Sequence, residues 1–116
     1  MKNYIQPGEV LTFTAVAPGA VSGTGQKIGD CFVVATITAA TGQQFTGLLD
    51  GVVEHAKVSA QAWTEGQQIN WDNATRLMTT VTTGNFRVGF AYKAAANPSA
   101  VGQVVLAGVN LGAALP

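Results

Sequence analysis

The sequence predicts an all-β fold: a small β-barrel or β-sandwich of about seven or eight short strands, preceded by an N-terminal arm. Threonine, valine and glycine dominate the composition, which suits pleated strands joined by tight turns. Short segments of alternating apolar and polar residues recur along the chain. Helix signals are almost absent, since only residues 59–64 could form a short helical turn, which Gly66 would end.

The expected strands follow one another with short connections. The first covers residues 9–17, where Phe13 and other apolar residues share one face. Residues 30–38 begin with apolar residues on both faces, which indicates a central strand. Asp50-Gly51 and Asn97-Pro98-Ser99 supply turns. The remaining strands are expected over residues 44–49, 51–58, 76–82, 86–93 and 102–111.

The clearest strand covers residues 86–93, and residues 76–82 are expected to pair with it as a hairpin across the turn at residues 83–85. Its residues alternate strictly, so one face is expected to be buried and the other exposed to solvent. Together with Phe13, the predicted core residues are those of the aromatic and apolar face: Phe86, Val88, Phe90 and Tyr92.

The chain of 116 residues is long enough for one domain, which buries about 65% of its surface on folding. We expect residues 1–8 to form the arm, residues 9–111 the β domain and residues 112–116 a C-terminal tail. The first nine residues contain no apolar run of signal-peptide length, and the chain contains no apolar run long enough for a membrane span.

Charge is scarce, because only 10% of the residues are charged and the six acidic and six basic side chains cancel. An average soluble domain has about 25% charged residues. A neutral surface does not attract nucleic-acid phosphates or anionic lipids, so neither nucleic acid nor membrane is predicted as a partner. Neutral proteins associate readily, which favours a protein that works in an assembly.

Residues 16–30 contain four glycines and a lysine, as a phosphate-binding loop does. A P-loop, however, places its lysine directly after the last glycine and continues into a helix. Here Gln26 separates Gly25 from Lys27, and a strand is expected to follow. The dinucleotide fingerprint fails because Gly29 occupies the seventh place instead of the sixth. We therefore interpret the stretch as a turn with Lys27 at its solvated tip.

No arrangement of side chains predicts catalysis, a cofactor or a metal. His55 adjoins Glu54, but strand alternation points the two to opposite faces, and a general base needs an orienting partner. The only cysteine, Cys31, occupies an apolar position typical of a buried thiol, and no internal disulfide can form. A single cysteine fits a reducing compartment or indifference to redox. Trp63 and Trp71 could form a ligand platform, but without a basic groove a core position or a subunit contact is favoured.

Several motifs occur together along the chain: Gln6-Pro-Gly-Glu-Val10, Trp71-Asp72 and Thr83-Gly-Asn85. Together they make the whole chain resemble the family of small capsid cement, or decoration, proteins of tailed phages, some of which carry the label "phage recombinase". The chain departs from the family pattern at residues 54–56 and at Asn70. The recombinase label gains no support, because the chain is short and has neither a nucleotide loop nor a basic DNA-binding face.

The resemblance implies a β-rich protein that forms a homotrimer on the outer surface of an icosahedral head. Such a protein is made in the bacterial cytoplasm, binds the major capsid protein, stabilises its lattice and needs no cofactor. We expect the arm to contact the capsid through apolar anchors and backbone pairing with a strand of the shell; a terminus without function is the alternative. The candidate contact residues are Lys2, Asn3, Tyr4, Ile5, Gln6 and Pro7.

Two rival functions stay open from the sequence. The chain could be another virion binding module, such as a fibre-tip or host-adhesion domain, which would be present in few copies per particle. It could also be an enzyme of nucleic-acid metabolism, which gel-shift and ATP hydrolysis assays would reveal.

Overall fold

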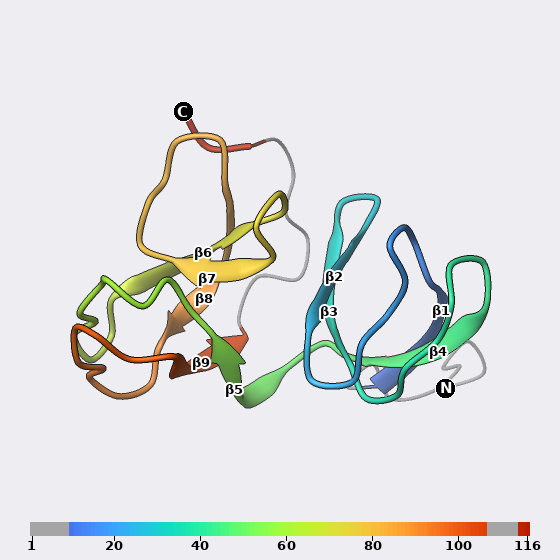
Figure 1. Ribbon diagram of the computed structural model, residues 1–116, viewed down its shortest axis with the longest axis horizontal. Helices are drawn as coiled ribbons and strands as arrows, with labels where there is room; N and C mark the ends of the chain where they lie inside the picture. The colour runs from blue at the N-terminus through green and yellow to red at the C-terminus, as the bar shows by residue number, and fades with distance from the viewer. Residues whose placement is uncertain (1–9, 107–113) are drawn as a thin grey trace, which may run out of the picture.

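The computed structural model describes residues 10–106 and 114–116, and this part of the chain folds into nine strands arranged in two antiparallel sheets (Figure 1). The strands are β1 (Val10–Thr14), β2 (Gly25–Ile28), β3 (Cys31–Ala35), β4 (Gln44–Leu48), β5 (Gly51–Ala56), β6 (Gln68–Asp72), β7 (Leu77–Thr79), β8 (Phe86–Ala91) and β9 (Val101–Leu106). The predicted all-β class is confirmed, and residues 59–64 form no helix.

The N-terminal half forms a four-stranded sheet in the order β1-β4-β3-β2. The central position predicted for residues 30–38 is confirmed, because β3 lies between β4 and β2. Its two faces serve two different core clusters. Phe32 and Val34 join the larger cluster between the sheets. Val33 and Ala35 join a smaller cluster with Phe45 on the other side.

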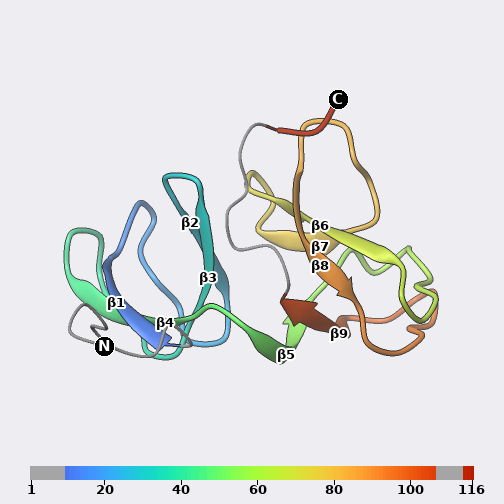
Figure 2. The ribbon, with the colours of Figure 1, turned by 180° about the vertical axis from the view of Figure 1, so that it is seen from behind.

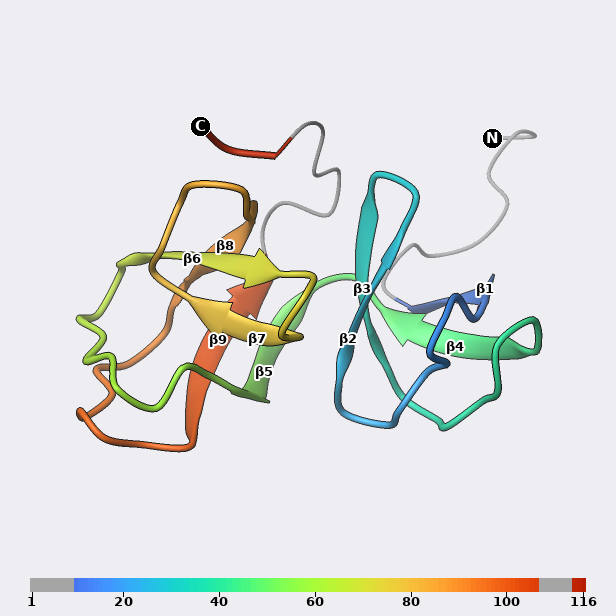
Figure 3. The ribbon, with the colours of Figure 1, turned by 45° about the horizontal axis from the view of Figure 1, so that its top comes forward.

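The C-terminal half forms a five-stranded sheet in the order β5-β9-β8-β6-β7. This sheet curls until its first and last strands approach each other (Figure 3). Just beyond β5, Lys57 pairs with Met78 of β7 in an isolated bridge, and the Val58 amide donates to the Met78 carbonyl at 3.0 Å. The half is therefore a partly closed five-stranded barrel.

The two sheets lie side by side and share the larger core cluster (Figures 1 and 2). Trp63 and Trp71 are both buried there, which confirms the interpretation of the tryptophans as core residues. The Trp71 ring lies 5.2 Å from the Phe32 ring, centre to centre, so an indole of the barrel packs directly on the four-stranded sheet. Phe13 is half-buried against the smaller cluster, 6.1 Å from Phe45.

The prediction that four residues of the 86–93 segment share a buried face is wrong for two of them. Val88 is 1% exposed and Phe86 is half-buried, but Phe90 and Tyr92 are 40% and 46% exposed. The cause is a β-bulge: on β6, Ile69 pairs with Gly89 while the next residue pairs with Arg87, so Val88 is an extra residue. A bulge resets the alternation of side chains, and Ala91 points inward in place of Phe90.

The predicted hairpin between residues 76–82 and 86–93 is also wrong. β7 pairs with β6, and β6 lies between β7 and β8. β6 was missing from the predicted strands, although polar and apolar residues alternate over residues 68–72 and the apolar ones, Ile69 and Trp71, are buried. The last predicted strand is observed as β9, and its residues 107–111 lie outside the described part of the chain. The arm and residues 112–113 of the tail lie outside it too.

Candidate functional site

The glycine-rich stretch forms β2 and its flanking turns, and no helix follows it. Gly23 and Gly29 have positive φ values of 83° and 59°, which favour glycine. Gly25 has a different reason for lacking a side chain, because a Cβ there would overlap the Phe32 ring. The stretch thus contains a strand, β2, that forms a hairpin with β3 instead of a single turn.

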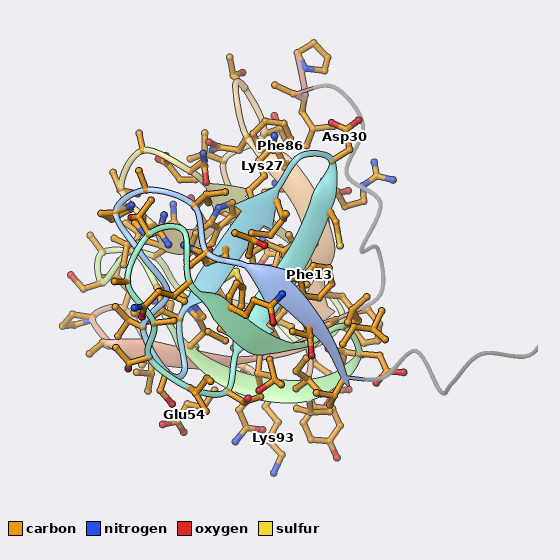
Figure 4. All side chains as sticks on the ribbon, turned by 90° about the vertical axis from the view of Figure 1, so that its right-hand side faces the viewer. Phe13, Lys27, Asp30, Glu54, Phe86 and Lys93 are labelled. Atoms are coloured by element: carbon orange, nitrogen blue, oxygen red, sulfur yellow. The ribbon has the colours of Figure 1, made fainter. Side chains whose placement is uncertain are left out.

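The prediction that Lys27 is a solvated turn tip is wrong. Lys27 lies on β2 and is half-buried. Its ammonium donates to the Gly29 carbonyl at 2.7 Å and lies 4.8 Å from the centre of the Phe86 ring (Figure 4). Through these two contacts, Lys27 links the β2–β3 turn to β8.

The outer edge of β2 is closed by two side chains of the barrel. The Gly25 amide donates to Nε2 of His55 at 3.0 Å. The Gly25 carbonyl accepts from Nη2 of Arg76 at 2.9 Å. Arg76 reaches this position from a tight turn in which its own φ is 61° and the amides of Ala74 and Thr75 donate to the Asp72 carboxylate. Both backbone groups of Gly25 are therefore satisfied although no strand pairs with this outer edge of β2.

His55 is a buried hydrogen-bond acceptor that joins β5 to β2. Its side chain is buried, with its ring edge-on to Trp71, and Glu54 is exposed on the opposite face as predicted. Nε2 accepts from Gly25, so Nδ1 carries the proton and donates to the Ala56 carbonyl at 2.8 Å. Burial lowers the pKa of His55 and Arg76 lowers it further, although the Ala56 carbonyl acts in the opposite direction. The imidazole is held neutral.

Lys57 is a buried residue that the sequence analysis did not identify. Its ammonium donates to the carbonyls of Val58, Gln61 and Ser99, and lies 5.4 Å from the centre of the Trp63 ring. Desolvation lowers the pKa of this lysine. Such a cage of carbonyls fastens two loops to the end of β5. No local pattern in the sequence signals it, because its acceptors are backbone atoms.

The remaining candidates are the cysteine and the potential metal ligands. Cys31 is half-buried, and burial raises the pKa of its thiol, which makes the thiol less reactive. Within the described residues, no group of three or more histidine, cysteine or carboxylate side chains is placed to hold a metal ion. The same residues include no helix long and apolar enough to cross a membrane.

Two surface features stand out as places for partners. The first is β1, an edge strand that pairs only with β4 in the described part of the chain. The second is the outward face of β5, β9 and β8, which we call the outer face. It is defined by the apolar side chains Val52, Phe90, Tyr92, Val101 and Val105.

Comparison with protein families gives this arrangement its context. The family model described as phage cement protein matches residues 5–107. The chain belongs to the phage cement protein family. A cement protein is a structural component associated with the phage capsid, which fits the structural roles of His55, Lys27 and Lys57. Neither the search of curated proteins nor that of solved structures found a match.

The candidate capsid-contact residues at positions 2–7 lie outside the described residues. The family match begins at residue 5 and so includes part of this segment.

Proposed function

We propose that this cement protein forms a homotrimer on the outer surface of the phage head and stabilises the lattice of the major capsid protein. The observation that carries the proposal is the family match over residues 5–107. The described surface supports it, since it combines exposed apolar side chains with few charges.

The stabilisation follows from mass action. A ligand that binds the assembled shell but not its loose subunits adds its binding free energy to the stability of the shell. Copies on a lattice contribute together, so modest contacts suffice for a large effect on the whole head. Neither nucleic acid nor a membrane takes part in this mechanism.

Residues 2–7 are the proposed capsid contact. They lead directly into β1, whose outer edge has no partner strand in the described residues. An edge strand can add to a sheet of another protein by backbone pairing. Tyr4 and Ile5 would supply the apolar anchors that fix the register.

The test uses heads purified from phage that lack this protein. Added protein should bind in hundreds of copies per head and raise the temperature at which the heads release DNA, measured by calorimetry and dye binding. Isolated capsid subunits are the control and should bind weakly. Binding in only a few copies would indicate a fibre-tip or adhesion module, and no rise in the release temperature would contradict the cement mechanism.

A double substitution tests the proposed role of the arm. Tyr4→Ser with Ile5→Ser should lower affinity for heads at least about tenfold, as expected for loss of buried anchors, and leave the melting temperature of the free protein unchanged. Val21→Ser removes an exposed apolar side chain elsewhere and is the matched control. Equal binding by both variants would assign the capsid contact to another surface.

A further inference from the structure

The outer face carries more exposed apolar surface than its strands need for folding. Val52 and Val101 are 53% and 44% exposed, comparable to Phe90 and Tyr92. Val52 and Phe90 both pair with Val105, from its two sides, so that they form one apolar row across three strands. Exposed apolar patches that span several strands mark interaction sites in soluble proteins.

The outer face has an acidic residue on one side of β9 and a basic residue on the other. Glu54 lies on β5, on one side of β9, and Lys93 follows β8, on the other side. Both residues line one hollow of about 200 Å³ together with Val101 and Gln103 of β9. Figure 4 shows Glu54 and Lys93 near each other at one end of the view. They are therefore at the same height along β9, with the acidic group on one flank and the basic group on the other.

We propose that the outer face is the surface through which copies of this chain contact one another, around a three-fold axis that runs along β9. Around such an axis, the outer face of every copy is directed towards the centre of the trimer. The β5 flank of each copy then lies beside the β8 flank of the next. Glu54 of one copy faces Lys93 of the next copy, three times over.

A second copy fits this face better than other occupants because the face is complementary to itself in charge. A partner of one sign would meet a repelling group on one of the two flanks. The chain as a whole is neutral, so copies do not repel each other. The inference rests on the proposed trimer and deepens it by naming the contacting surface.

The first test compares molar masses by gel filtration with light scattering. The parent should have the mass of three chains of 11.9 kDa. Phe90→Ser and Val52→Ser should each weaken association at least about tenfold and shift the mass towards one chain. Ile37→Ser is the matched control, since Ile37 is 49% exposed but lies on the other half of the molecule, and it should keep the parent mass. Circular dichroism checks that all variants are folded.

The second test exchanges the charges. Glu54→Lys alone and Lys93→Glu alone place like charges in contact and should each weaken association about tenfold or more. The double variant restores the pairing and should recover the parent mass. Asp30→Lys, at an exposed site in the β2–β3 turn of the four-stranded sheet, is the control and should have no effect.

The outcomes separate this inference from the proposed function. If the parent is a trimer and the Phe90→Ser and Val52→Ser variants remain trimers, the surface is wrong and the trimer stands. If the parent is a monomer at every concentration, the inference is overturned, while head binding still decides the cement function. If Phe90→Ser keeps its mass but no longer binds heads, the outer face docks the shell and the inference is wrong.

Discussion

The inner and outer faces of the five-stranded sheet carry similar residue types with opposite consequences. On the inner face, Trp71 and Val104 are fully buried in the core that joins the two sheets. On the outer face, Phe90 and Val52 are equally apolar but exposed. For Phe90 the cause is strand geometry, since one bulge at Val88 exchanges the faces along β8. The alternation of apolar and polar residues therefore predicts a strand. The pairing of that strand with its neighbours decides whether an apolar side chain is buried in the core or available to a partner.

The largest contrast is expected from aromatic residues on the two faces. Trp71→Ala should lower the free energy of unfolding by about 3–5 kcal/mol, because it empties the contact between the sheets. Phe90→Ala, measured in urea at a concentration where the protein is monomeric, should cost less than about 1 kcal/mol. Equal losses in the two variants would contradict the assignment of the faces.

A smaller effect is expected from adding one methyl group to β9. Gly102 points inward, and a Cβ there would overlap the Trp63 ring, so Gly102→Ala should destabilise the protein by about 1–3 kcal/mol. Its outward neighbour offers a control, because Gln103→Ala adds no volume to the core and, at a concentration where the protein is monomeric, should change stability by less than about 0.5 kcal/mol. Thermal melting of the two variants side by side measures the difference.

The pH dependence of stability tests the role of His55, which lies on the inward side of β5. The pKa of His55 in the folded protein lies below its ordinary value of 6.5, so the unfolded chain binds the proton first as the pH falls. The stability from His55 should be fully present above about pH 6.5 and should be lost as the pH falls through the lower pKa of the folded state. His55→Gln keeps an acceptor for the Gly25 amide without this titration, so its urea midpoint should vary less between pH 7 and pH 5. If the urea midpoint of His55→Gln changed with pH as much as that of the parent, groups other than His55 would determine the pH dependence of stability.

The smallest effect is expected at Lys27. Lys27→Ala removes one exposed hydrogen bond and the contact with the Phe86 ring, which together contribute about 0.5–1 kcal/mol. Neither the parent nor the variant should hydrolyse ATP, because no phosphate site is formed by this stretch. ATP turnover that disappears with Lys27 would revive the enzyme hypothesis.

The sequence was sufficient for the fold class and for most strands, because alternation and turn residues are local signals. It was not sufficient for the faces of β8, since the bulge depends on pairing with β6, a partner distant in the chain. The same limit applies to β2, whose outer edge is closed by His55 and Arg76, 30 and 51 positions away. Lys57 was missed for the same reason. The candidate contacts at positions 2–7 stay a prediction.

The position of β9 has a consequence for synthesis of the protein. β9 is the last strand in sequence among the described residues, yet it lies between β5 and β8 in the sheet. The barrel therefore cannot be completed until β9 has left the ribosome. A chain that ends early leaves the edges of β5 and β8 unpaired, and unpaired strand edges lead to aggregation. Truncated products should thus be removed by aggregation or proteolysis before they can occupy positions on a head.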